Sequence, residues 1–223
     1  VTQRAMEQSR LKTEVEELRG RSNSGAVDMV GTSPSLQSAR GVIEKSAPTN
    51  SRIFVSGPSG SGKGLAARLI HQHSPRAEAP FVEINCSLYS PDEVAFVLFG
   101  REAREKNGTV RTEVGALERA HGGTLYLSEV AALPAGVQAA LLRTLVENKF
   151  NRVGGTVAVP IDVRIISGSS QNVAQLIEDG TFRSDLFHRL SIVPLQLSPL
   201  RERREDVPAL VELFLDQIAR MHN

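Results

Sequence analysis

The residues best suited to chemistry lie in one glycine-rich run that directly follows the apolar stretch 53–56. The run reads Gly57, Pro58, Ser59, Gly60, Ser61, Gly62, Lys63, Gly64 and Leu65. Gly57, Gly62 and Lys63 fit the spacing G-x-x-x-x-G-K, which is typical of loops that wrap nucleotide phosphates with backbone N–H groups. Glycine lets the backbone approach the anion, the following helix start attracts negative charge, and Lys63 adds a cation for the β- and γ-phosphates.

The alternative is an ordinary glycine-rich turn before a surface helix. An apolar strand before the run and a helix-forming segment after it favour a nucleotide-binding loop. The position that normally carries a Mg²⁺-binding Ser or Thr is Gly64. The sequence therefore predicts phosphate binding with one metal ligand missing.

A second candidate stretch, residues 124–130, is an apolar run that ends in Ser128 and Glu129. In P-loop enzymes, a second strand ends in acidic residues that assist Mg²⁺ and polarise the attacking water. Glu129 fits the role of orienting water, but Ser128 stands where an aspartate is expected. The alternative is a buried strand that runs into a loop. No residue is assigned as a certain metal ligand, and the Mg²⁺ site is weakened at Gly64 and Ser128.

Three further residues are candidates for the same site. Asn85 ends a predicted strand next to the site and is suited to hydrogen-bond and restrain Glu129. Arg183 and Arg189 lie six residues apart, and arginine is well suited to stabilise transition-state charge on a γ-phosphate. By spacing alone, a surface salt bridge is the favoured interpretation of either arginine.

The elements that must position these residues alternate along the chain. We predict strands over 52–56, 81–84, 125–127 and 163–166, and helices over 35–47, 91–99, 134–148 and 171–179. Alternating strands and helices indicate an α/β fold, with a parallel sheet between two layers of helices. We expect a charged linker helix within residues 1–26 and an α/β core over 27–206. Residues 207–223 would hold the first helix of a further subdomain, from about Val207 to Met221.

Composition limits the classes of protein that fit. The 223 residues are 40% hydrophobic and 23% charged, with a formal net charge of +1, which does not indicate a nucleic-acid surface. No run approaches the length of a membrane span. The single cysteine, Cys86, forms no internal disulfide and fits a reducing cytoplasm.

The motifs together resemble a known family. In order, they read Gly57-Pro-Ser-Gly-Ser-Gly-Lys63, Leu98-Phe-Gly100, His121-Gly-Gly-Thr-Leu-Tyr-Leu127, Phe150-Asn-Arg-Val-Gly-Gly155, Phe182 to Leu190, and Pro199-Leu-Arg-Glu-Arg203. This series resembles the AAA+ P-loop NTPase domain of bacterial enhancer-binding proteins, the activators of sigma-54 RNA polymerase. The closest likeness within that family is to two-component response regulators of the NtrX type.

The resemblance implies a set of roles. The Lys63 loop would bind ATP or ADP, Glu129 would activate water, and Asn85 would switch Glu129. Val30 and Gly31 resemble the segment that lines the adenine pocket. Arg183 and Arg189 match arginine fingers, which implies a homo-oligomer, from a dimer to a hexameric ring.

The resemblance also places the chain in a larger protein. It implies a cytoplasmic transcription regulator, with RNA polymerase or a sigma factor as possible partners. A receiver domain would precede Val1, and a DNA-binding domain would follow a helical lid of which residues 207–223 form only the start. We expect DNA binding only through that further domain, and no membrane association.

Departures from the family pattern change the expected activity. The family's sigma-54-contacting loop would fall at Arg104-Glu-Lys-Asn-Gly-Thr109, which shares only a glycine with it. Ser128 replaces an aspartate, and Ser170 replaces a sensor asparagine. We therefore predict nucleotide binding with slow or no hydrolysis. Two alternatives remain: an active mechanochemical ATPase that remodels RNA polymerase, and a GTPase-like switch suggested by Asn148-Lys-Phe-Asn151.

Overall fold

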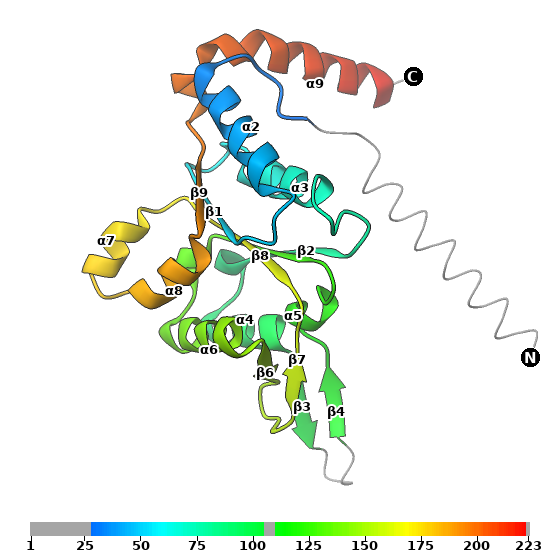
Figure 1. Ribbon diagram of the computed structural model, residues 1–223, viewed down its shortest axis with the longest axis vertical. Helices are drawn as coiled ribbons and strands as arrows, with labels where there is room; N and C mark the ends of the chain where they lie inside the picture. Colours follow the sequence, from blue (N-terminus) through cyan, green and yellow to red (C-terminus); the bar gives the residue numbers. More distant parts are fainter. Residues whose placement is uncertain (1–27, 105–109, 222–223) are drawn as a thin grey trace, which may run out of the picture.

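The computed structural model describes residues 28–104 and 110–221 of the chain. Two predicted segments lie outside the described part (Figure 1). One is the linker helix within residues 1–26, and the other is residues 105–109, most of the loop expected in the place of the family's sigma-54-contacting loop.

Five parallel strands form the central sheet. They are β1 (Ile53–Ser56), β2 (Phe81–Asn85), β5 (Thr124–Ser128), β8 (Arg164–Ser169) and β9 (Val193–Gln196). Their order across the sheet is β2-β5-β8-β1-β9, and every neighbouring pair is parallel. The sequence predicts the first four and misses β9, which contains Pro194. Proline cannot donate to a strand ladder, so its presence argues against a central strand, and β9 is in fact an edge strand.

Helices cover both faces of the sheet (Figure 1). One face packs against α2 (Pro34–Ser46) and α3 (Lys63–Gln72), and the other packs against α4 (Pro91–Phe99), α5 (Ala116–Arg119), α6 (Ala135–Glu147), α7 (Val173–Glu178) and α8 (Ser184–Leu190). Side chains alternate between the two cores: in β5, Leu125 and Leu127 join one core while Tyr126 joins the other. The predicted three-layer α/β architecture is confirmed.

Local sequence explains where the helices begin. The side chain of Ser33 caps α2, whose first residue is proline. Ser90 and Glu93 form a reciprocal capping box at the start of α4. These caps fix where the two helices begin.

Two antiparallel pairs extend beyond the main sheet, at the end of the molecule away from α2 (Figure 1). They are β3 (Arg101–Arg104) with β4 (Val110–Glu113), and β6 (Lys149–Asn151) with β7 (Ala158–Pro160). The sequence prediction includes neither pair. The Asn148-Lys-Phe-Asn151 run ends α6 and forms β6, at this far end of the molecule.

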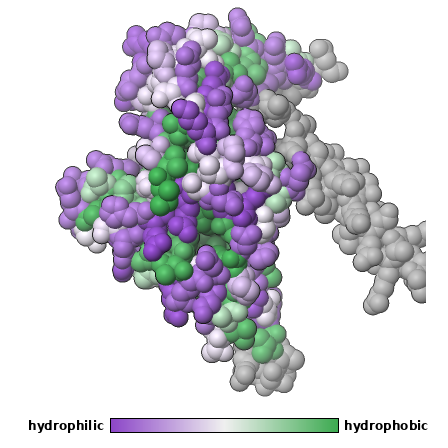
Figure 2. Space-filling model, in the orientation of Figure 1, coloured by the Kyte–Doolittle hydropathy of each residue, from purple (hydrophilic) through white to green (hydrophobic). Residues whose placement is uncertain are grey.

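The last described helix is α9 (Val207–Met221), with the bounds expected from the sequence. It crosses the end of the molecule next to α2 (Figure 1). Its exposed apolar residues are Val207, Val211, Phe214, Leu215 and Ile218. The view in Figure 2 shows some hydrophobic surface at this end of the molecule, among mostly hydrophilic residues. Among the described helices, none combines the length and the apolar character needed to cross a membrane.

Candidate functional site

The glycine-rich run forms a loop between the carboxyl end of β1 and the start of α3. Gly60 and Gly62 have φ angles of 78° and 99°, in the left-handed region that favours glycine. Gly62 is the residue before the first turn of α3, and it brings no side chain to cap the free N–H groups there. The loop therefore presents unpaired backbone donors at a helix start, which is the arrangement that binds anions.

A cavity of about 620 Å³ opens over this loop at the carboxyl edge of the sheet. Among the residues that the sequence predicts for the site, its walls contain Ser59, Gly60, Gly62, Lys63, Gly64, Asn85, Ser128 and Glu129. β2 and β5 pair so that Asn85 lies opposite Ser128, which brings the two strand ends to one side of the cavity. Six other predicted residues, Val30, Gly31, Gly57, Pro58, Ser61 and Leu65, lie outside its lining.

Lys63 is 7% exposed, and its ammonium group is fully engaged within the site. Nζ donates to the carbonyl oxygens of Gly57 and Pro58, at 2.8 and 3.2 Å. It also forms an ion pair with Oε1 of Glu129 at 3.2 Å. A polyphosphate would have to replace one of these three contacts, because an ammonium group has only three donors.

Glu129 is held in a specific conformation. Its backbone is left-handed, with φ of 51° and ψ of 47°, which is uncommon for a residue with a side chain. Its Oε2 accepts hydrogen bonds from the backbone N–H and the hydroxyl of Ser170, at 2.9 and 2.7 Å. Burial alone would raise the pKa of Glu129, but the hydrogen bonds from Ser170 and the contact with Lys63 outweigh it and lower the pKa. The carboxylate is therefore ionised at neutral pH.

Asn85 does not make the contact that the sequence suggested. Its Oδ1 accepts hydrogen bonds from the N–H and the hydroxyl of Ser87, at 3.0 and 2.8 Å, and so caps the short helix η1 (Cys86–Leu88). The partner that restrains Glu129 is Ser170, from the end of β8. Asn85 nevertheless lines the same cavity as Glu129.

The donor set of the cavity fits Mg²⁺ poorly. Gly64 has no side chain, Ser128 offers a hydroxyl, and Glu129 is already engaged by Lys63 and Ser170. The remaining carboxylate, Glu83, bonds Arg68 through one oxygen at 2.8 Å, and its other oxygen lies 3.6 Å from where a Cβ on residue 64 would stand. Across the described residues there is no cluster of three or more His, Cys, Asp or Glu side chains that would hold a metal.

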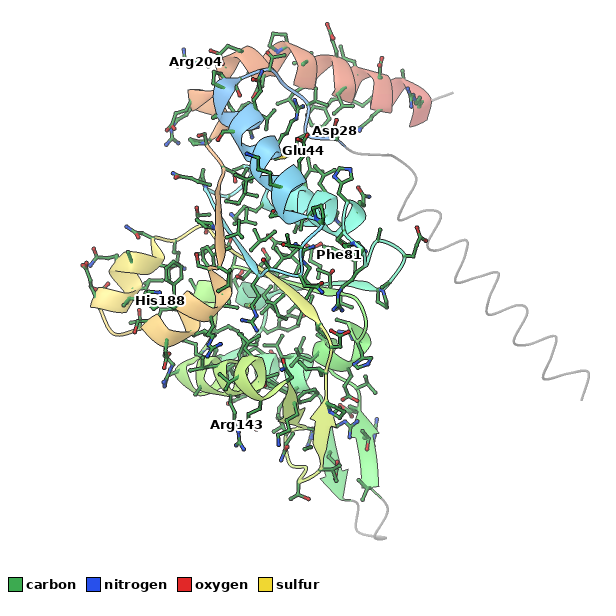
Figure 3. All side chains as sticks on the ribbon, in the orientation of Figure 1. Asp28, Glu44, Phe81, Arg143, His188 and Arg204 are labelled. Atoms are coloured by element: carbon green, nitrogen blue, oxygen red, sulfur yellow. The ribbon has the colours of Figure 1, made fainter. Side chains whose placement is uncertain are left out.

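The two candidate arginine fingers lie on the surface of α8 and at its start. Arg183 is about half exposed and pairs with Asp185 through two hydrogen bonds, at 3.0 and 2.7 Å. Arg189 is exposed near the end of α8, beside His188, which projects from this part of the molecule (Figure 3). Neither arginine lines the cavity of its own chain.

Sequence reasoning missed two buried residues near the loop. The mixed charges of residues 201–206 are typical of a solvated approach to a helix, yet Asp206 is completely buried and Arg203 is 11% exposed. Nη2 of Arg203 donates to the carbonyl of Ser61 at 3.0 Å. The spacing of three residues between Arg203 and Asp206 was the available signal, because such a pair lies on one side of a helical turn.

The fold and the loop define a class of protein: a P-loop nucleotide-binding domain of the AAA+ type, with a parallel sheet between helices and the phosphate loop after its first strand. Comparison with known families is more specific. Residues 29–196 match the model of the sigma-54 interaction domain. The chain belongs to this family.

Individual relatives agree. The chain is 48% identical over 219 residues to the nitrogen assimilation regulatory protein NtrX of Azorhizobium caulinodans, covering 98% of this chain and 47% of that protein. Two crystal structures of NtrX from Brucella abortus, both 52% identical, cover 98% of this chain. The ADP complex has a TM-score of 0.82 over 48% of that chain, and the ATP complex has a TM-score of 0.80 over 49%. This chain therefore spans about half the length of these relatives.

Proposed function

We propose that this chain is the ATP- or ADP-binding central domain of a two-component transcription regulator of the NtrX type. The observation that carries the proposal is the phosphate loop, with Lys63 at its end and Glu129 across the cavity at 3.2 Å. The structures of similar NtrX proteins with ADP and with ATP support the nucleotide class. In this arrangement the N–H groups at the start of α3 and Lys63 would hold the phosphates, as Glu129 withdraws from the lysine.

The catalytic apparatus is incomplete in this proposal. Glu129 is ionised and suited to orient water, but hydrogen bonds from Ser170 and the ion pair with Lys63 compete for it. Ser128 provides no carboxylate, so the site binds nucleotide with at most weak help from a divalent cation. We therefore propose slow or negligible hydrolysis.

Assembly and partner contacts form the second half of the proposal. Arg183 and Arg189 are exposed and outside their own cavity, which is compatible with contact to the phosphates of a neighbouring copy in a ring. The β3–β4 pair would carry a loop without the usual sigma-54-contacting sequence, so contact with sigma-54 would differ from that of other activators. Residues 207–223 would begin a helical lid, and DNA binding would need a further domain.

The proposal is tested by isothermal titration of ATP and of ADP into the 223-residue chain, with and without Mg²⁺. We expect binding of both nucleotides, with a dependence on Mg²⁺ of less than about threefold, because the usual metal ligands are absent. Absence of binding at millimolar nucleotide would refute the proposal. Tighter binding of GTP than of ATP in competition would favour the GTPase-like alternative.

Hydrolysis is tested separately with Ser128→Asp and Glu129→Gln. We expect Ser128→Asp to raise the rate of ATP hydrolysis at least about tenfold by restoring a metal-assisting carboxylate, and Glu129→Gln in the same background to abolish the gain. A wild-type rate already near one turnover per second, about the lower end of common turnover numbers, would favour the alternative of an active mechanochemical ATPase.

A further inference from the structure

A buried chain of polar contacts joins three segments that are far apart in the sequence: the phosphate loop, the segment before α2, and the turn that leads into α9. Arg203 and Asp206 are its centre. Asp206 closes the short helix η4 (Arg204–Asp206), and α9 follows immediately. Arg204, which lies in the same turn, is at the end of the molecule where α9 begins (Figure 3).

Asp206 fixes the start of α9 to the segment before α2. Its Oδ1 accepts hydrogen bonds from the N–H groups of Thr32 and Ser33, at 2.7 and 2.8 Å, and its Oδ2 accepts one from the Ser33 hydroxyl at 2.7 Å. The contact is so close that a Cβ on Gly31 would lie 2.3 Å from Cγ of Asp206. The φ angle of Gly31, 143°, also disfavours other residues, so this junction requires glycine.

Arg203 extends the connection to the phosphate loop. One guanidinium nitrogen lies 3.8 Å from Oδ2 of Asp206, and another donates to the carbonyl of Ser61 at 3.0 Å. The peptide bond is planar and trans, so holding this carbonyl directs the N–H of Gly62 the opposite way. Gly62 lines the nucleotide cavity, and Arg203 therefore controls the orientation of a loop donor without entering the cavity.

The junction also has hydrogen-bonding capacity that it does not use. Nε of Arg203 and the hydroxyl of Ser61 are both buried and have no hydrogen-bond partner within the described part of the chain. An unpaired buried polar group costs about 1–3 kcal/mol, so a loop position that pairs either atom would recover part of that cost. The contact between Arg203 and Ser61, which joins the phosphate loop to the turn before α9, therefore leaves two polar atoms available for further hydrogen bonds.

We propose that Arg203 is a positioning residue that couples nucleotide occupancy of the phosphate loop to the first turns of α9. The inference rests on the proposed nucleotide binding and adds a path by which bound nucleotide affects α9. Nucleotide contact with the Gly62 N–H fixes the Ser61 peptide, Arg203 follows the Ser61 carbonyl, and Asp206 carries the constraint to α9. Because coupling is reciprocal, loosening Arg203 weakens nucleotide binding.

The test compares Arg203→Met with a matched control, Arg201→Met. Arg201 lies in the same segment but is 75% exposed, so both variants lose one positive charge and only one loses the buried contact. Affinity for ADP is measured by calorimetry. Amide hydrogen exchange of α9 is measured with and without ADP. If Arg203 only supports the fold, the change in α9 exchange that ADP causes should be the same in Arg203→Met as in the wild type.

In the wild type and in Arg201→Met, we expect ADP to slow exchange in the first two turns of α9 by about tenfold. In Arg203→Met, we expect ADP affinity to fall by about tenfold and the protection of α9 to disappear. Arg203→Lys, which keeps the charge but loses the planar fork, is expected to lie between the two. If Arg203→Met does not fold, Arg203→Lys and Asp206→Asn take its place, and we expect each to lose part of the ADP affinity and part of the α9 protection.

Two results would overturn the inference while leaving the proposed function intact: tight ADP binding with no change in α9 exchange in the wild type, or equal affinity and equal α9 protection in Arg203→Met. Failure of the wild type to bind ADP would refute both the proposed function and this inference.

Discussion

The carboxyl and amino ends of the central strands form two opposite edges of the sheet. Each of these edges carries a cavity lined by charged residues, yet the charges are paired in different ways. At the carboxyl edge, Lys63 forms an ion pair with Glu129 and donates to two loop carbonyls, and Glu129 accepts hydrogen bonds from Ser170. A polyphosphate can replace the Glu129 carboxylate at the Lys63 ammonium group. The pairing in this cavity of about 620 Å³ is therefore displaceable by an anionic ligand.

At the amino edge, a cavity of about 500 Å³ is lined by Arg52, Arg76 and Arg164. Arg164 is almost fully buried and donates to the carbonyl oxygens of Ser46, Ala47 and Ser51. Burial, with Arg76 nearby, lowers the pKa of Arg164 to about 10, which still leaves it charged at neutral pH.

The other arginines of this edge are engaged in the same way. Arg52 donates to the carbonyl oxygens of Leu145 and Arg189, near the ends of two helices. Arg76 donates to both the carbonyl and the carboxylate of Asp162. Their donors complete helix ends and loops, where cations also complement the helix dipole. Positive charge in a cavity thus indicates a ligand site only where its donors are free or displaceable.

The strongest test of this contrast is Arg164→Met. In the wild type, Arg164 donates to three carbonyl oxygens, and this substitution removes their donor. We therefore expect the free energy of unfolding to fall by about 4 kcal/mol. Urea unfolding measures the loss, and Arg143→Met, at a site that is 76% exposed, is the control. ADP affinity of the folded protein should stay at the wild-type value. Loss of affinity with unchanged stability would show that the amino edge belongs to a ligand site.

Lys63→Ala is expected to do the opposite. It removes the phosphate-binding cation, so ADP affinity should fall by about 100-fold, or about 3 kcal/mol, measured by calorimetry. Its three present contacts are with loop carbonyls and with Glu129, which water can replace, so unfolding should change little. Lys45→Ala, at an exposed site in the last turn of α2, is the control. An ADP affinity equal to that of the wild type would contradict the assignment of the loop.

The smallest effect is expected for Ser170→Ala, which removes one of two hydrogen bonds to Glu129. A carboxylate with a lowered pKa stabilises the fold above its unfolded pKa, and this stabilisation is lost as the pH falls through the folded pKa. Ser170→Ala should therefore be about 1 kcal/mol less stable at pH 7, with the difference shrinking below about pH 4. Thermal unfolding over this range measures it, and Ser87→Ala is the control. A difference that does not depend on pH would show that Ser170 acts on packing instead.

The sequence alone determined the phosphate loop, the position of Glu129, four of the five strands and the bounds of α9. These features depend on contiguous residues: a motif of fixed spacing, apolar runs of strand length, and a helical period. The order of strands and helices then implied that the strand ends meet at one edge. β9 and the two hairpins were not predicted, because short strands and a proline give a weak local pattern.

Tertiary structure decided which side chains meet. Ser170 contacts Glu129 from 41 residues away, and Arg203 reaches Ser61 from 142 residues away. Neither contact leaves a periodic trace in the sequence, because a hydrogen bond depends on distances within about 3 Å and on angles that only the packed core fixes. For the same reason, Asn85 and Arg164 had the right residue types for several roles. Only the folded chain showed that Asn85 caps a turn and that Arg164 closes a helix end.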